Sequence, residues 1–437
     1  MNFSQQFLRR QSRRHALKRL GAFTLGLSAS AGLGTGALTA IGRAAASAPA
    51  PAPAPAENPL KHILILCQEN RSFDTYFGYY ERAGRFAVPA NYSQPGGAGK
   101  PAVKPYHFSS YTNHDIPHSW QALHAEWNGG KMDGFVTTDG LEALGYYTRS
   151  DLPYYYALAD AFTLCGNYFC YQLGPTLPNR LALWSGTSGG ITNNRPGPGS
   201  LDWPTIADLL DQHGVSWQSY NLNSHSRQRI GSPNGFNGLA YFKRWINDAR
   251  LYGSEDDYYQ ALVDGTLPQV VFLITSSEVS EHPPSNVRTG EKKVAEIINA
   301  LIASRYWSQA AFILTYDENG GYFDHIAPPQ LDAYGLGMRV PTLIISPWVK
   351  RGYVAGQLYE HSSVLKFIER TFGLPTLASL NHQFDDETPA SNNDAAAGRS
   401  AGPPAPPRDG LAQIGDLYEV FDFSQDPHYY PPLPPAP

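Results

Sequence analysis

Four short apolar segments have the length and pattern of buried β-strands. The first, His62 to Cys67, is a continuous apolar run followed at once by polar residues. A run without alternation predicts a strand covered on both faces, as in a parallel sheet flanked by helices. Similar runs follow at 269–275, 311–316 and 342–346.

Two further segments, 292–304 and 362–372, have the periodicity of amphipathic helices. Strands that alternate with helices predict an α/β sandwich with a central, mostly parallel sheet flanked by helices. With 437 residues, of which 42% are hydrophobic, the chain is long enough to bury a substantial core.

The first 48 residues predict an export signal. A basic start precedes an uncharged stretch of small and apolar residues from Leu20 to Ile41. In the basic part, Arg13, Arg14 and Lys18 resemble the twin-arginine signature that directs folded proteins to the twin-arginine export machinery. We therefore expect a periplasmic or secreted protein. A membrane anchor is the alternative, but this stretch is only weakly hydrophobic, and we expect no stable transmembrane segment in the mature chain.

The remaining chain divides by composition. Residues 49–58 alternate proline with alanine and predict an extended tether. Residues 59–437 are expected to form the catalytic domain. Within it, a segment near 381–409 is rich in Asn, Asp, Ala, Gly and Pro, which predicts a mobile loop.

Charge and cysteine content exclude some classes of protein. A formal charge of -5 does not indicate the basic surface that binding of nucleic acid requires, so no nucleic-acid partner is expected. Three cysteines are too few for a disulfide framework, although Cys165 and Cys170 are close enough in sequence to pair in an oxidising compartment.

Acidic and amide residues directly follow two of the predicted strands, where open α/β sheets bind ligands. Glu69 and Asn70 follow the first strand, and Asp317 and Glu318 follow the run at 311–316. Their oxygens suit a hard divalent cation such as Ca²⁺, and nearby histidines keep Zn²⁺ open. Taken alone, the first pair is equally consistent with a helix N-cap.

Thr176 is the candidate nucleophile. Pro175 and Pro178 flank it and predict a fixed turn or extended backbone rather than a regular helix. A threonine hydroxyl needs a metal ion or a base beside it to attack phosphorus. An ordinary rigid turn is the simpler interpretation of this segment.

Several histidines complete the candidate chemistry, because phosphoryl transfer requires donors for the phosphate oxygens and an acid for the leaving group. They are His114, His118, His282, His325 and His361.

Several motifs in this order resemble the bacterial phospholipase C family, which also contains acid phosphatases. The motifs include 69–74, 158–165, 174–180, 316–319, 323–325, 339–341, 346–348, 361–369 and 415–417. The resemblance implies an α/β fold of the alkaline phosphatase and sulfatase superfamily.

The resemblance also implies roles for individual residues. It implies one divalent metal ion, Ca²⁺ or Zn²⁺, held by Glu69, Asn70, Asp317 and Glu318 with Thr176 Oγ1 at its apex. The implied catalytic set is Thr176, His118, His282 and His325, and the implied substrate-binding set is Asn70, His114, Arg180 and His361.

The expected function is therefore an exported, metal-dependent phosphoric ester hydrolase that acts through a phosphothreonine intermediate. The expected substrate is a phospholipid or a small phosphoester. An acid phosphatase acting on soluble phosphomonoesters is the near alternative, and a noncatalytic periplasmic phosphoester-binding protein is the distant one. Leu177 and Gly320 stand where the phospholipases commonly carry aspartates, which leaves the substrate class open.

Overall fold

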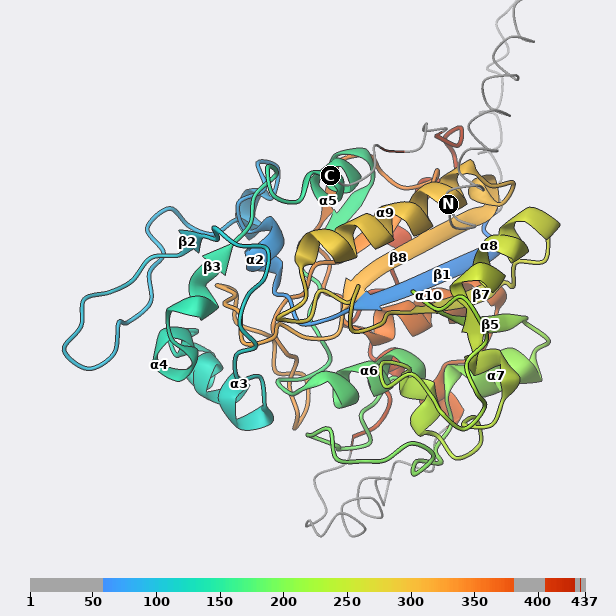
Figure 1. The fold of residues 1–437 in the computed structure, drawn as a ribbon, viewed down its shortest axis with the longest axis horizontal. Helices are drawn as coiled ribbons and strands as arrows, with labels where there is room; N and C mark the ends of the chain where they lie inside the picture. Colours follow the sequence, from blue (N-terminus) through green and yellow to red (C-terminus); the bar gives the residue numbers. More distant parts are fainter. Residues whose placement is uncertain (1–57, 381–404, 429–432, 434–437) are drawn as a thin grey trace, which may run out of the picture.

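The computed structural model describes residues 58–380, 405–428 and 433 (Figure 1). Their centre is one eight-stranded sheet in which only β9 runs antiparallel to its neighbours. In spatial order the strands are β10 (Tyr353–Ala355), β4 (Thr163–Cys165), β9 (Leu343–Ile345), β8 (Ala310–Tyr316), β1 (His62–Gln68), β7 (Val270–Ile274), β5 (Trp217–Asn221) and β6 (Gly253–Ser254). The predicted α/β class with a mostly parallel sheet is confirmed.

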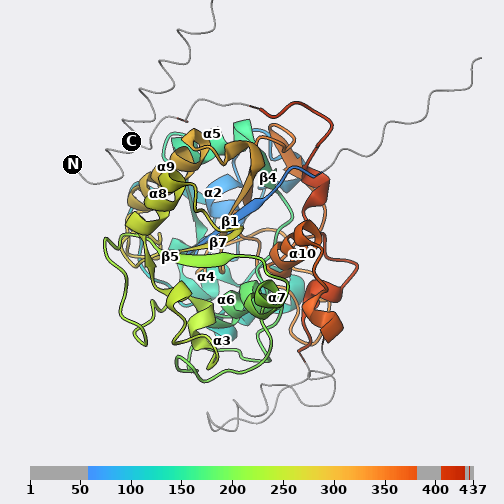
Figure 2. The ribbon, with the colours of Figure 1, turned by 90° about the vertical axis from the view of Figure 1, so that its right-hand side faces the viewer.

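Helices cover both faces of the sheet. Figure 2 shows α5, α8 and α9 on one face and α6, α7 and α10 on the other. The helices are α2 (Phe73–Phe77), α3 (Trp120–Trp127), α4 (Phe135–Asp139), α5 (Pro153–Ala161), α6 (Thr176–Ser185), α7 (Ile206–Gln212), α8 (Glu255–Asp264), α9 (Val287–Ala303) and α10 (Ser362–Phe372). This arrangement explains why the central strands have continuous apolar runs, because each face of the sheet meets a helical layer.

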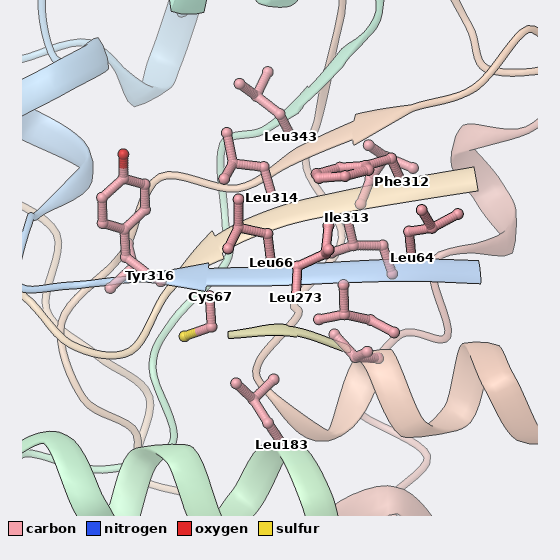
Figure 3. Packing of buried hydrophobic residues seen from close by; sticks show 14 of the residues in the cluster. Leu64, Leu66, Cys67, Leu183, Leu273, Phe312, Ile313, Leu314, Tyr316 and Leu343 are labelled. Carbon is pink, nitrogen blue, oxygen red and sulfur yellow. The ribbon is translucent and has the colours of Figure 1, made fainter. Parts of the chain in front are cut away.

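The core centres on β1, which pairs in parallel with β7 and β8. Its side chains alternate between the two faces, so Leu66 and Cys67 point to opposite sides (Figure 3). Cys67 faces Leu183 of α6, and Leu66 lies near Leu314 of β8. Burying one such leucine stabilises the fold by about 1.5–3 kcal/mol.

Residues 73–150 gather beyond the sheet on the side to which β1 points (Figure 1). This part contains α2, α3, α4 and a small parallel ladder of β2 (Tyr106–His107) and β3 (Gly145–Tyr146). It therefore lies at the edge of the sheet where ligand sites of open α/β folds are found.

The expected helices and strands are present with two differences. The helix expected from residue 292 begins at Val287, because the Asn286 side chain caps it by accepting a hydrogen bond from the Arg288 N–H at 2.9 Å. The run at 342–346 forms β9, which is antiparallel although its apolar pattern resembles that of the parallel strands.

Two expectations about covalent and local structure are corrected. Cys165 and Cys170 are buried free thiols, as is Cys67, so the pairing considered for them is absent. The loop expected to be mobile as far as Asp409 is anchored over 405–409, where Arg408 is buried and its Nε donates to Asp332 at 2.7 Å. Residues 381–404, and the predicted signal and tether up to residue 57, lie outside the described residues.

Every helix in the described ranges lacks the combination of length and apolar character that crossing a bilayer requires.

Candidate active site

The two acidic pairs predicted from sequence meet at one edge of the sheet. Gln68 and Tyr316 are register partners in β1 and β8, so the residues that follow them leave the sheet side by side. The backbone N–H of Asn70 donates to Asp317 Oδ1 at 3.1 Å, which joins the two strand ends directly. We call Glu69, Asn70, Asp317 and Glu318, with the Arg180 that contacts them, the strand-end cluster.

Close backbone packing supports this junction. Asn70 adopts a positive φ of 58°, and Gly320 adopts 63°. A Cβ on Gly320 would lie 2.6 Å from the carbonyl oxygen of Asn70, so glycine is required there. This explains the glycine that follows the second acidic pair.

The strand-end cluster contains more acceptors than the protein satisfies. Among the described residues, three fully buried oxygens of this cluster have neither a hydrogen bond nor an ion pair with Arg180: Glu69 Oε2, Asn70 Oδ1 and Glu318 Oε1. Glu69 Oε1 and Asp317 Oδ2 are paired only with Arg180. Buried polar atoms are normally paired, so each such atom requires an explanation. Carboxylate and amide oxygens that exceed the donors around them are the kind of ligand that a hard divalent cation prefers. The residues therefore fit the implied metal.

The charges of the cluster support the same interpretation. Burial raises the pKa of Glu69 well above its usual value; Arg180 opposes this shift, and the negative charge of Asp317 adds to it. Burial, followed by the charge of Asp317, likewise raises the pKa of Glu318. A divalent cation would remove this penalty by stabilising the ionised carboxylates.

Arg180 lies inside the strand-end cluster, where it forms ion pairs with Glu69 and, at 3.4 Å, with Asp317. Its other guanidinium contacts are the carbonyls of Cys67, Gln68 and Phe236. The guanidinium is therefore engaged by carboxylates and carbonyls of the protein itself, and its role in substrate binding stays a prediction.

Thr176 is the first residue of α6, which corrects the expectation that its flanking prolines exclude a regular helix. Proline is compatible with the first turn because the N–H groups there lack helical partners. Asn179 fixes the preceding turn, since its Nδ2 donates to the carbonyls of Gly174 and Pro175 at 2.8 and 3.0 Å. Thr176 and Arg180 are four residues apart and share one helix face, so Thr176 lies beside the residue that contacts Glu69 and Asp317.

His118 and His282 form a pair next to the strand-end cluster. Their ring centroids are 5.8 Å apart, and His118 Nε2 lies 3.4 Å from Asn70 Nδ2 and 4.0 Å from Glu318 Oε1. The Nδ1 atoms of the two rings contact the carbonyls of Ile116 and Pro283. Because a carbonyl only accepts, each Nδ1 carries a proton, which leaves Nε2 as the nitrogen of each ring that can take part in chemistry.

The other three predicted histidines are not in this pair. His361 is buried with Nε2 donating to the Asp317 carbonyl at 2.8 Å, and burial lowers its pKa to about 4. It therefore holds the backbone of Asp317 in place, and the substrate-binding role predicted for it stays a prediction. The side chain of His114 is 91% exposed and lies beside Glu142, so the structure does not bring it into the site.

His325 belongs to a second buried group, which we call the Arg339 cluster: Asp74, Asp324, His325 and Arg339. His325 Nδ1 contacts Asp74 Oδ2 at 2.6 Å, and Arg339 donates to Asp74 at 2.8 Å and to Asp324 at 2.9 Å. Its imidazole is committed to this network, so of the two predicted general acids only His282 lies beside the strand-end cluster.

Sequence reasoning missed Glu281, which precedes His282. Its buried carboxylate accepts hydrogen bonds from Tyr76, Tyr155, Tyr316 and Gln68. Its φ of 70° lies in the left-handed region, which costs a non-glycine residue about 1–3 kcal/mol. The local sequence pattern does not indicate that Glu281 accepts these hydrogen bonds, because the four donors come from three different parts of the chain.

The chain belongs to the phosphoesterase family, whose model matches residues 60–375. It is similar to a non-hemolytic phospholipase C of Burkholderia pseudomallei, with 32% identity over 450 residues that cover 86% of this chain and 61% of the relative. It is also similar to a hemolytic phospholipase C of Pseudomonas aeruginosa, with 32% identity covering 72% of this chain and 53% of the relative. The chain thus spans between half and about three fifths of these relatives.

A phospholipase C A of Mycobacterium tuberculosis is 34% identical over 383 residues, which cover 72% of this chain and 73% of the relative. Among solved structures, an alkaline phosphatase superfamily protein from Vibrio parahaemolyticus has 12% sequence identity and a TM-score of 0.37. That match covers 72% of this chain and 66% of the other.

Proposed function

We propose that the protein is an exported, metal-dependent phosphoric ester hydrolase of the phospholipase C type that uses Thr176 as its nucleophile. The observation that supports this proposal is the strand-end cluster, whose buried carboxylates of Glu69 and Asp317 contact Arg180, four residues after Thr176 in α6. The names of the similar phospholipases C support the substrate class.

The divalent cation, Ca²⁺ or Zn²⁺, would be held by Glu69, Asn70, Asp317 and Glu318, and when bound it would supply positive charge for the phosphate and for the ionised Thr176 hydroxyl. Asn70 offers both functions of its amide, since Oδ1 is unpaired and Nδ2 faces His118. The positive end of the α6 dipole further stabilises negative charge at Thr176.

The chain's own residues then perform two displacements. The ionised Thr176 Oγ1 attacks phosphorus in line while the alcohol oxygen leaves, and the protonated imidazole of His282 gives the leaving oxygen the proton on Nε2. The product is a phosphothreonine. Water then attacks the phosphorus from the vacated side, His282 Nε2 takes up a proton of that water, and Thr176 Oγ1 leaves as the anion that began the cycle. His118 and the Asn70 amide hold the nonbridging oxygens.

Thr176→Ala tests the nucleophile. It should fold and bind metal normally but lose at least about 10³-fold in kcat, because its hydroxyl acts in the transition state. Thr176→Ser should keep partial activity, and acid quenching of the wild type should place phosphate on Thr176. An alanine variant within about tenfold of wild type, roughly 1.4 kcal/mol, would exclude the two-step mechanism.

A panel of phosphatidylcholine, p-nitrophenyl phosphorylcholine and p-nitrophenyl phosphate tests the substrate class. We expect the diesters to be preferred. If kcat/KM for the monoester exceeds that for the diesters by more than about a hundredfold, roughly 2.7 kcal/mol, the protein is an acid phosphatase.

Export is proposed from the basic start with Arg13 and Arg14. Replacing both by lysine should retain the protein in the cytoplasm, as measured by cell fractionation. If this variant is exported at the wild-type level, the protein does not depend on the twin-arginine route.

A further inference from the structure

A cleft of about 440 Å³ opens beside the candidate active site. Pro175, which directly precedes Thr176, and His118, which contacts Asn70, both line it. A substrate whose phosphorus lies at Thr176 would therefore place one of its two ester groups in this cleft. The acyl chains of a lipid favour an apolar environment, so the polar headgroup is the group that suits it.

The lining of the cleft is polar, and its charged groups are basic. Arg195 and His118 are the ionisable members, and the others are Ser119, Trp120, Gln121, Pro175, Thr192, Asn193 and Asn194. The neighbouring carboxylate of Asp115 contacts His118 Nδ1 at 3.5 Å and is not among the lining residues. Hydroxyl and amide groups around a basic rim recognise hydroxyl groups and anions.

The aromatic content of the cleft does not suit a quaternary ammonium group. Such cations are recognised over aromatic faces, commonly several of them together. Trp120 is the single Trp, Tyr or Phe of the lining, and the ring of His124 lies against it, tilted by 33° at a centroid distance of 4.1 Å. One face of the indole is thus covered by another side chain.

We propose that this cleft binds the headgroup of the substrate and selects hydroxylated or anionic headgroups over choline. The proposal rests on the proposed phosphodiesterase function. Arg195 provides the cation for an anionic headgroup, and the Asn193 and Thr192 side chains provide partners for hydroxyl groups.

Three p-nitrophenyl phosphodiesters that share a leaving group and differ in headgroup, namely glycerol, glycerate and choline, test the proposal. We expect kcat/KM for the glycerol and glycerate esters to exceed that for the choline ester by at least about tenfold. Arg195→Gln should lower the glycerate-to-glycerol ratio by about five- to tenfold. Arg229→Gln, an exposed arginine outside the cleft, is the matched control and should leave the ratio unchanged.

Preference for the choline ester, or an unchanged glycerate-to-glycerol ratio in Arg195→Gln, would overturn the headgroup assignment while leaving the proposed function intact. A wild-type enzyme that hydrolyses none of the three diesters would overturn the proposed function and this inference with it.

A second and independent observation concerns Glu281. Its carboxylate accepts from Gln68 Nε2 at 3.1 Å and from the Tyr316 hydroxyl at 2.7 Å. These two donors directly precede Glu69 and Asp317, the first members of the two ligand pairs. The carboxylate thus joins the ends of β1 and β8 at the point where the metal ligands begin.

The backbone of Glu281 is fixed as firmly as its side chain. Its carbonyl accepts from Arg71 Nε at 3.2 Å and Nη2 at 2.8 Å, and Arg71 Nη1 donates to Asn113. Arg71 therefore connects the loop that bears His282 to the loop that leads to His118. Helix α9 packs directly against the Glu281 side chain, since a Cβ on Gly290 would lie only 2.2 Å from Glu281 Cγ.

We infer that Glu281 is a positioning residue that sets the spacing of the two ligand pairs and places His282 beside them. Glu281→Gln keeps the shape of the side chain but removes an acceptor oxygen. It should weaken Ca²⁺ or Zn²⁺ binding to the metal-stripped protein by about 10- to 100-fold, measured by calorimetric titration.

Glu291→Gln is the matched control. Glu291 is also buried, and its carboxylate accepts from the N–H groups of Tyr154 and Tyr155, away from the ligand pairs. It should change thermal stability but not cation affinity. Equal cation affinity in the two variants would overturn the inference. If Glu281→Gln does not fold, Tyr316→Phe, which removes one donor, is tested in the same way. A wild type that binds neither cation would instead overturn the proposed metal site.

Discussion

The strand-end cluster and the Arg339 cluster contain the same kinds of residue and differ in how they are paired. Both are buried. In the Arg339 cluster, the ligand atoms of Asp74, Asp324 and His325 lie within 4.8 Å of one another, which is close enough to hold a metal ion. In the Arg339 cluster, however, the guanidinium donates to both aspartates, and Asp74 Oδ2 also accepts from the His325 N–H at 2.7 Å.

Charge separates the two clusters further. The strand-end cluster has three carboxylates and one guanidinium, which pairs with two of them, whereas in the other cluster two carboxylates pair with Arg339 and a histidine. The first group has an excess of negative charge and three oxygens with neither a hydrogen bond nor an ion pair to its arginine, while Asp324 Oδ2 is the one such oxygen of the second among the described residues. Residue type therefore does not distinguish a site from a structural network, but unpaired acceptors do.

The largest expected effect comes from exchanging one aspartate for asparagine in each cluster. Asp317→Asn should lose bound metal and at least about 10³-fold in kcat, roughly 4 kcal/mol, because a charged ligand is removed. Asp324→Asn should retain its metal and lower thermal stability instead. Metal content by elemental analysis and steady-state kinetics separate the two; loss of metal in Asp324→Asn would contradict the comparison.

Arg339→Met should reduce the free energy of unfolding by about 3–5 kcal/mol, since it leaves two buried carboxylates without their cation. Urea titration of the metal-loaded protein measures this loss. A loss below about 1 kcal/mol would show that Arg339 is not what balances Asp74 and Asp324.

Removal of the metal should destabilise the wild type and Asp324→Asn equally. At a cation concentration of 100 times Kd, bound metal contributes about 2.7 kcal/mol to the folded state. Asp317→Asn should show almost no change in melting temperature on chelation. If chelation lowers the melting temperature of Asp317→Asn as much as that of the wild type, the metal does not bind at the strand-end cluster.

The smallest effect concerns pH. Burial disfavours the charged form of His325, but the hydrogen bond and charge of Asp74 outweigh it and raise the pKa of this imidazole. The charged pair therefore stabilises the fold below the unfolded value of about 6.5 and ceases to do so as pH rises through the folded pKa. The stability difference between wild type and His325→Gln should shrink between pH 6 and pH 8.5, measured by urea titration; a difference that grows would contradict the pairing.

Much of the fold could be predicted from local sequence because hydrophobic periodicity is a local property. The apolar runs at 62–67 and 311–316 coincide with β1 and β8. The amphipathic segment at 362–372 coincides with α10. The meeting of the two acidic pairs at one edge was predictable for the same reason, since Glu69 and Asp317 directly follow those strands and parallel neighbours end at one edge.

Only the tertiary structure decided which charged groups meet. Arg180, His361 and His325 each carried a predicted role at the substrate, yet packing directs the first two to the strand-end carboxylates and the Asp317 backbone and the third to Asp74. Glu281 had no predicted role because its partners are separated from it by up to 213 residues. Sequence by itself determined the strands and the acidic residues that follow them, because both depend on near neighbours. The pairing of buried charges depends on which distant segments pack together, and the free energy of that pairing is set by burial and geometry that no local pattern contains.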